Sequence, residues 1–578
     1  TLRGIVDFLF EHEALLGGGA DAAGGTGTDA AAAPADVPVS EAVPEPAAGE
    51  PEGIPSGANR FVVTLDDQPL GPTRDLTGLP VTVTGGSALA RALVEELGRR
   101  GAAARLATGA AGAGNGNGNG NGKGAAQLVV LTDLVDGALG EGPVVEIPEL
   151  YARIRPLLLE TTSEILVVSP LGGGLGIDPP SPLRATGDDV PDALPVAAGV
   201  RGMVKTAALE YLDRRIGLVD LDPGEAAADL ARAIADEVEQ RYGAVEVAWR
   251  QGVRRGSRIG VRPDTPTGTE LPLTPESVVL LTGGARGITA RVAVALAERS
   301  GCAVELVGRS ALPDGEEPPE IAACTDRAAL RGALIKTGLR EPRAIERECD
   351  RILAGREASA TLAALRGAGS QVTYHQVDVR DAAALEAVVA DVYARHGRLD
   401  AVVHGAGILD DHFIADKAPD AFERVFTTKV EGARTLLRAI RRAVGEGRER
   451  PRFVVFFGST AGVCGNRGQA DYAAANDALD AMAAANPDVA DSIFALDWGP
   501  WSSEAGMVSD ALAAIFQAGG MGLIQVADGT AVMFDEIAAA FGQGGTELLR
   551  PHQVTVARCA PELIAAAFAH ASSGQGRS

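Results

Sequence analysis

The pattern of apolar and polar residues predicts a strand-turn-helix unit that occurs twice along the chain. Residues 79–106, LPVTVTGGSALARALVEELGRRGAAARL, begin with a β-branched run and pass through a glycine turn into apolar positions spaced as on one helix face. Residues 277–310, SVVLLTGGARGITARVAVALAERSGCAVELVGRS, follow the same plan. The repeat predicts two α/β halves, each built on a mostly parallel sheet.

Further β-branched segments extend each half. In the first half they are QLVVLTD, EILVVSP and RIGLVDLDP, and AVEVAWRQGVRRGS closes the unit. In the second half they are VTYHQVDVRD, LDAVVHGAG, RFVVFFGS and DSIFALDWG. Between residues 311 and 365 a charged segment rich in Ala and Leu interrupts the second half. It predicts helices that decorate the second sheet, with no function readable from their residues.

Two stretches of low complexity separate or interrupt these units. Residues 17–59 consist largely of Ala, Gly, Pro, Glu and Asp, which bury too little apolar surface to order a fold. They predict a flexible linker. Residues 110–126, AAGAGNGNGNGNGKGAA, lie between two apolar segments and predict a flexible surface loop.

Composition narrows the possible functions. The chain has 578 residues, of which 46% are hydrophobic, enough for two or three packed domains. Its net charge of −25 argues against a nucleic-acid partner, because phosphate-backbone affinity comes from clustered Lys and Arg. The five cysteines show no CxxC spacing, which favours reduced thiols, and the seven histidines form no ligand-spaced cluster, so no metal is expected. No apolar run approaches the ~20 residues of a membrane helix, so no membrane partner and a cytoplasmic protein are expected.

The glycine-rich turn of the second half is the first candidate binding site. It follows a strand and opens a helix, where glycines let a pyrophosphate approach the backbone at the positive helix end. Its candidate residues are Thr282, Gly283, Gly284, Arg286, Gly287 and Ile288. Thr289 stands where the dinucleotide pattern usually has its last glycine. The alternative is a purely structural turn, which is the better interpretation of Gly85 and Gly86 in the first half.

The next strand ends add to this site. Arg309 stands where a carboxylate would bind a free ribose hydroxyl, so its guanidinium favours the 2′-phosphate of NADPH. A merely solvated arginine is the alternative. Asp378 and Val379 are placed to contact an adenine edge, although an Asp at a strand end is nearly as often a turn residue. After His404, the small residues Gly405, Ala406 and Gly407 leave room for a cofactor.

A hydroxyl, a phenol and a carboxamide predict the reactive centre. Ser459 lies 13 residues before Tyr472 and Asn476 lies four after it. With Ser459 at a strand end and the other two one turn apart on a helix, all three side chains can converge on one substrate carbonyl.

The second half resembles the ketoreductase domain of polyketide synthases, in the short-chain dehydrogenase/reductase superfamily. The matching motifs are TGGARG, LVGR, VVHGAGILDD, KVEGA, GSTAGVCGNRGQADYAAAN and WGPW. The resemblance implies that Lys429 of KVEGA lowers the pKa of Tyr472, although its spacing to Ser459 is longer than expected of the family. It also implies that Tyr472 gives a proton to the developing alkoxide, Ser459 binds the carbonyl oxygen, Asn476 supports the relay, and NADPH supplies hydride.

The resemblance also implies an organisation for the whole chain. Such ketoreductases pair a degenerate structural half with a catalytic half, both Rossmann-like and doubly wound. The domains expected here are an acyl carrier protein end at 1–16, the linker, a structural subdomain at 60–265, a catalytic subdomain at 270–560 and a tail at 561–578. This order is similar to enediyne-type iterative polyketide synthases and polyunsaturated fatty acid synthases.

The implied substrate is a β-ketoacyl thioester on the phosphopantetheine arm of an acyl carrier protein, with other domains of the same synthase as partners. Two alternatives stay open. One is a noncatalytic dinucleotide-binding scaffold, against which the Ser459, Tyr472 and Asn476 set argues. The other is a dehydrogenase of free small-molecule carbonyls.

The loop after the HGAG turn bears on product configuration. In the resembling ketoreductases an LDD signature marks the B-type class, and this chain carries Leu409, Asp410 and Asp411. The tryptophan that marks the A-type class would stand at Cys464. The resemblance therefore implies a D-(3R)-β-hydroxyl product. The structural alternative is that Asp410 or Asp411 caps the next helix.

Overall fold

The computed structural model describes residues 54–107, 128–177, 194–241, 244–262, 270–313, 315–502, 510–541 and 552–573. The segment expected to end a carrier protein, the expected linker up to residue 53 and the expected loop at 110–126 lie outside these ranges.

The catalytic half predicted from the sequence is a parallel sheet in the doubly wound order β11-β10-β9-β12-β13-β14-β16. Its strands have continuous apolar runs because helices cover both faces of the sheet. The strands are β9 (Val278–Thr282), β10 (Ala303–Gly308), β11 (Val372–Gln376), β12 (Ala401–His404), β13 (Phe453–Ser459), β14 (Ser492–Trp498) and β16 (Gln553–Cys559).

The first half repeats this plan with six parallel strands in the order β3-β2-β4-β5-β6-β7, and β8 pairs antiparallel with β7. The α/β prediction is confirmed for both halves. The strands are β2 (Pro80–Thr84), β3 (Ala103–Ala107), β4 (Leu128–Leu131), β5 (Glu164–Ser169), β6 (Ile216–Leu221), β7 (Glu246–Arg250) and β8 (Val253–Val261).

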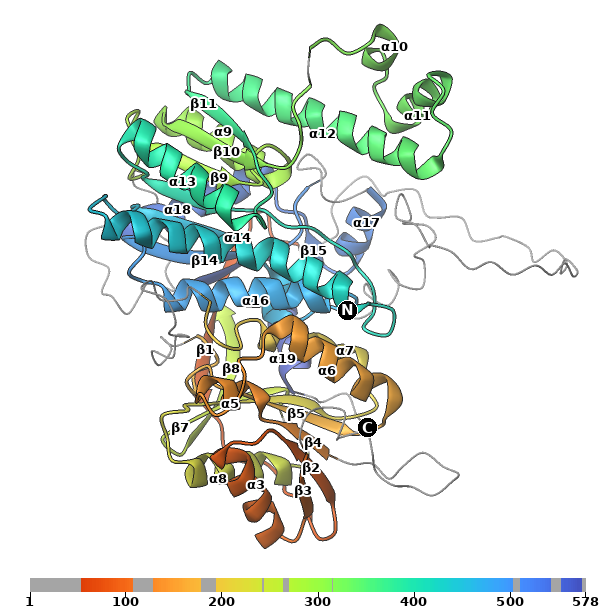
Figure 1. Ribbon diagram of the computed structural model, residues 1–578, viewed down its shortest axis with the longest axis vertical. Coiled ribbons are helices and arrows are strands. Elements are labelled where there is room, and N and C mark those ends of the chain that lie inside the picture. The colour runs from red at the N-terminus through yellow and green to blue at the C-terminus, as the bar shows by residue number, and fades with distance from the viewer. Residues whose placement is uncertain are drawn as a thin grey trace, which may run out of the picture.

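The two sheets join into one through a strand that the sequence pattern did not predict. Strand β1 (Asn59–Asp67) pairs antiparallel with β16 of the catalytic half on one side and with β8 on the other. A short strand, β15 (Met521–Gly522), pairs with β16 off this path. Figure 1 shows β1 and β8 running between the upper and lower halves. The first half is therefore fixed to the catalytic half by backbone hydrogen bonds.

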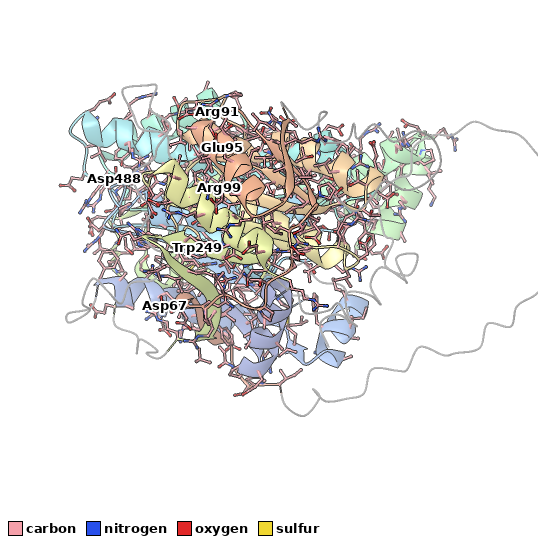
Figure 2. The ribbon with its side chains drawn as sticks, turned by 90° about the horizontal axis from the view of Figure 1, so that it is seen from below. Asp67, Arg91, Glu95, Arg99, Trp249 and Asp488 are labelled. Atoms are coloured by element: carbon pink, nitrogen blue, oxygen red, sulfur yellow. The ribbon has the colours of Figure 1, made fainter. Side chains whose placement is uncertain are left out.

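Helices cover both faces of the joined sheet. Those of the first half are α3 (Ala88–Arg99), α5 (Asp133–Ala138), α6 (Ile147–Glu160), α7 (Val200–Glu210) and α8 (Ala227–Glu239). Those of the second are α9 (Gly287–Ser300), α13 (Ala382–His396), α14 (Pro419–Gly445), α15 (Thr460–Cys464), α16 (Ala470–Ala485), α17 (Asp510–Ala518) and α18 (Val526–Phe541). Figure 2 shows Arg91, Glu95 and Arg99 along α3, whose opposite side packs Leu89, Leu93 and Leu97 into the core.

Helices α7 and α16 pack tightly between the halves, and small residues make this possible. A Cβ added at Gly199 would lie 2.6 Å from the Ala474 carbonyl oxygen, and one at Gly202 would lie 2.3 Å from that of Ala473. The contact continues into one hydrophobic core shared by α6 and α7 with α14 and α16. The helix that carries Tyr472 is thus held by the first half.

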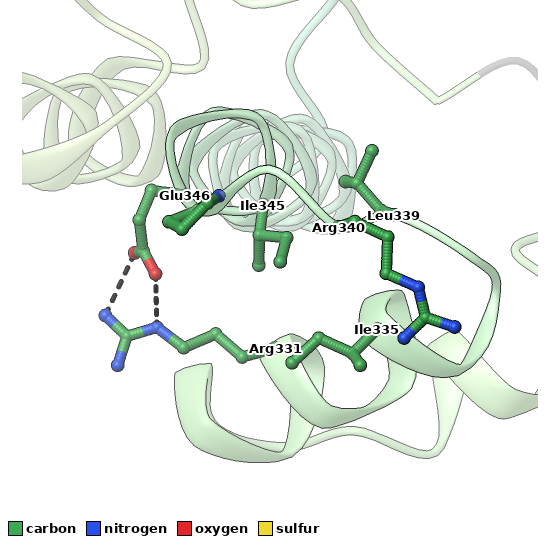
Figure 3. Close-up of a pocket in the computed structure, with 7 residues that line it drawn as sticks. Arg331, Ile335, Leu339, Arg340, Ile345 and Glu346 are labelled. Atoms are coloured by element: carbon green, nitrogen blue, oxygen red, sulfur yellow. Dashed lines mark hydrogen bonds and ion pairs between the residues drawn. The ribbon is translucent and has the colours of Figure 1, made fainter.

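The expected insertion is helical. It contains α10 (Pro319–Ala322), α11 (Arg327–Lys336) and the long α12 (Pro342–Gly367). Glu346 of α12 binds Arg327 and Arg331 of α11, and the two helices enclose a pocket at this end of the insertion (Figure 3). In Figure 1 the insertion lies above the edge of the catalytic sheet, near α9 and β11.

The expected tail contains helix α19 (Pro561–Ser573), whose Ile564 and Phe568 are buried. They pack in a cluster with Phe61, Ile259 and Val463, between strands of both halves. All five cysteines are buried free thiols. Within the described ranges, no helix has the length and apolar character needed to cross a bilayer.

Candidate active site

The predicted site residues gather at one edge of the catalytic sheet. Strands β9 to β13 are parallel, so their carboxyl ends lie on the same side. The chain order reverses between β9 and β12, where open α/β sheets form their ligand crevice. The glycine turn, Arg309, Asp378, the HGAG turn and Ser459 all follow these strand ends.

The glycine-rich turn fits a dinucleotide phosphate. Gly283 has φ +73°, and a Cβ there would lie 3.0 Å from the Ala406 backbone nitrogen and the Gly405 carbonyl oxygen. Arg286 is the N-cap of α9 and makes no side-chain capping bond. First-turn amides of α9 therefore face the turn, where an anion is stabilised by N–H donors and the helix dipole.

One carboxylate of the insertion lies against this turn. Glu357 of α12 accepts a hydrogen bond from the Gly287 amide at 2.8 Å and one from Arg286 Nε at 2.9 Å. Thr361, one turn further along α12, donates to the Ala285 carbonyl oxygen at 3.0 Å. The sequence pattern gave no indication that the insertion contacts the candidate cofactor site.

The other predicted cofactor residues occupy the neighbouring strand ends. Arg309 is exposed, and no hydrogen bond or ion pair of its side chain occurs within the described residues. Asp378 binds Arg380 at 2.7 Å, as a turn residue would, and Val379 is buried. Thr289 packs against Gly405, where an added Cβ would lie 2.2 Å from the Thr289 Oγ1. The glycine at 405 therefore makes room for the threonine that replaces the last glycine of the dinucleotide motif.

The four predicted catalytic residues lie together. Lys429 Nζ donates to Asn476 Oδ1 at 2.7 Å and to the Phe457 carbonyl oxygen at 2.5 Å. It lies 5.4 Å from the centre of the Tyr472 ring. Asn476 Nδ2 donates to the Tyr472 carbonyl oxygen at 2.6 Å, and the Ser459 side chain lies close enough to the Tyr472 phenol to lower its pKa. Ser459 Oγ also caps α15 by accepting from the Ala461 amide.

The protonation states correct one expectation. Burial raises the pKa of Tyr472 above its usual value, and hydrogen bonds with Ser459 and Asn476 oppose the rise only in part. The net shift is therefore opposite to the lowering expected from Lys429, because burial is the largest effect on this phenol. Burial lowers the pKa of Lys429 itself to about 8, with nearby Asp497 and Asp480 opposing the shift. The phenol therefore holds its proton at neutral pH and is available as an acid.

Several buried polar groups behind Lys429 support its position and were not predicted. His404 Nδ1 lies 2.7 Å from Thr282 Oγ1, and its Nε2 lies 2.8 Å from the Lys429 carbonyl oxygen. Burial lowers the pKa of His404 to about 4, so the ring is neutral and Nε2 carries the proton that the carbonyl accepts. The Nδ1 atom then accepts from Thr282. This histidine links the glycine turn to the lysine helix.

A pair of buried carboxylates lies on the other side of the lysine. Gln553 Nε2 donates at 2.7 Å to both Asp480 Oδ2 and Asp497 Oδ2. Burial raises the pKa of Asp497 to about 7 and that of Asp480 well above its ordinary value. Asp497 lies in the segment LDWG and Asp480 in the segment NDALD, which have the patterns of an ordinary strand and an ordinary helix. The only sequence signal for this carboxylate pair was therefore an Asp at a position expected to be buried.

The predicted stereocontrol loop is anchored and does not cap a helix. Asp410 pairs with Arg424 and His412, and Asp411 accepts from Gln469 at 2.8 Å. The next helix, α14, begins at Pro419 after Ala418, so the capping alternative is not found. Leu409 is 51% exposed at the tip of the loop.

The first half holds this loop and the turn before Tyr472 together. Glu210 of α7 accepts from the Ile414 amide at 2.7 Å and from the Gly468 amide at 2.8 Å. Tyr151 of α6 donates to the Lys417 carbonyl oxygen at 2.8 Å. Burial raises the pKa of Glu210 to about 7. The first half thus contacts both the loop after the HGAG turn and the segment before Tyr472.

The corresponding positions of the first half are closed. Its glycine turn is occupied by Asp136, which accepts from the Gly86 amide at 2.7 Å and is 4% exposed. Ser169, the counterpart of Ser459, is fully buried and donates to Asp220 at 3.1 Å. The structural-turn interpretation of Gly85 and Gly86 agrees with this arrangement.

Comparison with known proteins finds a family model and relatives that are similar to this chain. Residues 277–503 match the family model of the KR domain. The chain is 31% identical over 362 residues to a polyunsaturated fatty acid synthase of Thraustochytrium sp., covering 59% of this chain and 12% of that protein. It is 32% identical over 311 residues to polyketide synthase GfsA of Streptomyces halstedii, covering 53% and 4%. The chain therefore spans a small part of the length of these relatives.

Solved structures share the fold of both halves. PlmKR1, a ketoreductase from the first module of phoslactomycin biosynthesis in Streptomyces sp. HK803, aligns with a TM-score of 0.62 at 22% identity, over 89% of this chain and 96% of that one. A C2-type ketoreductase from a modular polyketide synthase aligns with a TM-score of 0.63 at 21% identity, over 88% and 97%. The predicted pair of Rossmann-like halves is confirmed.

Proposed function

We propose, on the premise that residues 277–503 belong to the KR domain family of polyketide synthase ketoreductases, that the chain reduces a β-ketoacyl thioester to the β-hydroxyacyl thioester with NADPH. The observation that carries the proposal is the cluster of Lys429, Asn476, Tyr472 and Ser459 at the switch point of the catalytic sheet. A scaffold that only bound a dinucleotide would not need these four groups in contact.

The residues of the cluster have complementary tasks in this proposal. Tyr472, protonated because burial raises the pKa of its phenol, gives its proton to the substrate oxygen as negative charge develops there. Ser459, which lies close to the Tyr472 phenol, binds the same oxygen. Lys429 stabilises the phenolate that is left, and Asn476 holds the lysine by accepting from Nζ. Proton loss from Tyr472 is balanced by formation of the substrate O–H bond.

The turn residues would hold the dinucleotide, which when bound supplies the hydride. Gly283 and the start of α9, including the Gly287 amide that Glu357 contacts, would face its pyrophosphate, and the exposed guanidinium of Arg309 would bind its 2′-phosphate. The choice of NADPH over NADH rests on Arg309. The rest of the cofactor would lie along the Gly405, Ala406 and Gly407 turn, whose glycines admit Thr289 and Lys429 close to the backbone.

The Leu409, Asp410 and Asp411 loop supports a D-(3R)-β-hydroxyl product, because the loop forms the wall beside Tyr472 through the Asp411 contact with Gln469. We further propose that the acyl chain is presented on the phosphopantetheine arm of an acyl carrier protein within a larger synthase. The short share of the relatives' length that this chain covers agrees with such an arrangement.

The test compares wild type with Tyr472→Phe, using Tyr211→Phe in the first half as the matched control. NADPH oxidation is followed with a β-ketoacyl thioester, and NADPH affinity is measured separately by fluorescence. Loss of the proton donor should lower the rate on the order of 10²- to 10⁴-fold and leave affinity unchanged. Near-normal turnover in Tyr472→Phe, or an equal loss in Tyr211→Phe, would reject the proposed acid.

A further inference from the structure

The insertion helix α12 brings a carboxylate to the candidate cofactor site. Glu357 contacts both the Gly287 amide at the start of α9 and the Arg286 guanidinium. These are the two kinds of donor, a helix N-terminal amide and an arginine, that bind phosphate groups. A side-chain anion therefore occupies donors that a ligand anion could use.

The surroundings place this contact on the side of the site where the cofactor's ribose phosphate would bind. Arg286 lies close enough to Tyr374 of β11 to lower its pKa electrostatically, against a larger rise from burial. The Tyr374 hydroxyl in turn donates to the Ser310 carbonyl oxygen at 2.7 Å, next to Arg309. Arg286 and the residue after Arg309 are thus both near the Tyr374 side chain. Of the two guanidiniums, those of Arg286 and Arg309, Glu357 engages the first.

The first half shows what a permanently closed turn looks like. There Asp136 and Glu141 bind the Gly86 and Ala88 amides at 2.7 Å, and Asp136 is 4% exposed. The Glu357 side chain, by contrast, is 43% exposed and its Arg286 partner 52% exposed. Solvent screening makes an exposed ion pair weak, so a doubly charged phosphate can replace it. The buried Asp136 carboxylate, by contrast, cannot rotate into solvent to leave its amide donor.

We propose that Glu357 is an internal competitor for the phosphate-binding donors of the glycine turn, displaced when NADPH binds, with its pyrophosphate taking the Gly287 amide and its 2′-phosphate the Arg286 guanidinium. Through it the insertion sets how tightly the domain holds its cofactor. This inference rests on the proposed function, because it assumes that the turn binds NADPH. It gives the insertion, for which the sequence indicated no function, a role in cofactor binding.

The contacts of α12 explain how the carboxylate is held ready. Thr361 ties the helix to the Ala285 carbonyl oxygen one turn from Glu357, and Arg356 binds Glu317 at 2.6 Å and the Cys324 carbonyl oxygen at 2.7 Å. The helix can therefore stay in place while the Glu357 side chain alone swings away. Displacement needs rotation of one exposed side chain.

The test measures the dissociation constants of NADPH and NADH for wild type and Glu357→Gln, by the change in reduced-nicotinamide fluorescence on binding. The glutamine keeps the size of the side chain and removes its charge. The control is Glu348→Gln on the same helix, where Glu348 also pairs with an arginine, Arg351. Thermal unfolding of all three proteins verifies that each is folded.

We expect Glu357→Gln to bind NADPH about three- to tenfold more tightly, a gain set by loss of an exposed pair and of its repulsion toward phosphate. NADH affinity should change less, and Glu348→Gln should match wild type. In Arg286→Ala the effect of Glu357→Gln should shrink, because the shared partner is gone.

The outcomes separate this inference from the proposed function. If wild type binds neither dinucleotide, the proposed function fails and the inference with it. If wild type binds NADPH but Glu357→Gln leaves its affinity unchanged, the inference alone is overturned. Weaker NADPH binding in Glu357→Gln would also overturn it, since the carboxylate would then orient Arg286 in favour of the cofactor.

Discussion

Replacing Lys429 by methionine should separate catalysis from folding, because the lysine is costly to bury and valuable to the proposed reaction. Its side chain is nearly fully buried, and its ammonium donates hydrogen bonds to the Phe457 carbonyl oxygen and to Asn476 Oδ1. Methionine fills a similar volume without charge. We expect a large loss of rate and a small change in stability.

Both magnitudes follow from the structure. A unit charge 5.4 Å from the Tyr472 ring, at an effective dielectric constant of about 20, stabilises a phenolate by about 3 kcal/mol, which is ~10²-fold in rate. The pKa of Lys429, lowered from 10.5 to about 8, means that burying the ammonium costs about 3 kcal/mol. Methionine removes that cost but leaves two acceptors without a donor, at about 1–3 kcal/mol each. At the middle of that range the two effects nearly cancel, and the unfolding free energy should fall by no more than about 3 kcal/mol.

The pH dependence has a definite sign. Between pH 8 and 10.5 the unfolded chain binds more protons at Lys429 than the folded chain, so stability rises with pH through this window. Below pH 8 the full cost is present. Lys429→Met should therefore lack this part of the slope.

The assay combines urea unfolding with turnover of a β-ketoacyl thioester, expressed per folded molecule. The control is Lys205→Met, a buried lysine of α7 that binds Glu246 and the Val463 carbonyl oxygen, both at 2.8 Å. It should lose stability with little change in rate per folded molecule. A rate within threefold of wild type in Lys429→Met would refute the reasoning, as would a stability loss that accounts for the whole decrease.

Three further predictions follow from contacts around the site. Arg309→Asp should weaken NADPH binding and spare NADH in fluorescence titrations, and an equal loss for both would remove Arg309 from phosphate binding. Asp411→Ala, which frees Gln469, should lower the configurational purity of the alcohol on chiral chromatography more than it lowers NADPH affinity, and unchanged purity would contradict the loop argument. Glu210, whose pKa of about 7 lies above its usual value, binds more protons folded than unfolded, so its contribution to stability falls as pH rises from 4.5 to 7; Glu210→Gln should flatten that part of the profile, and a slope as steep as wild type would argue against the shift.

Much of the fold could be predicted because local pattern and tertiary structure agree. The strand-turn-helix units at 79–106 and 277–310 combine β-branched runs, glycine turns and helical periodicity, and each forms as expected. Strand β1 was missed because NRFVVTLDD adjoins the low-complexity linker. It forms a strand by pairing with β16 and β8, which are far away in the chain. Helix α19 was missed because its few apolar residues become core only when both halves are assembled.

The candidate site was predictable to the extent that its residues follow strand ends. Ser459 and Tyr472 could be paired by spacing, and Lys429 by family resemblance, since nothing local shows that Lys429 Nζ reaches Asn476. The direction of the Tyr472 pKa shift could not be foreseen, because it depends on burial by residues from several elements. His404, Glu210 and Glu357 act through contacts between distant segments, which a single sequence does not reveal.

Product analysis tests the central claim most directly. The chain is incubated with NADPH and a β-ketoacyl thioester attached to an acyl carrier protein, and the hydrolysed product is separated by chiral chromatography, with Tyr472→Phe run in parallel. The account predicts a D-β-hydroxyacyl product from wild type and little product from the variant. An unreduced β-ketoacyl chain in the wild-type reaction, or an equal yield of alcohol from Tyr472→Phe, would contradict it.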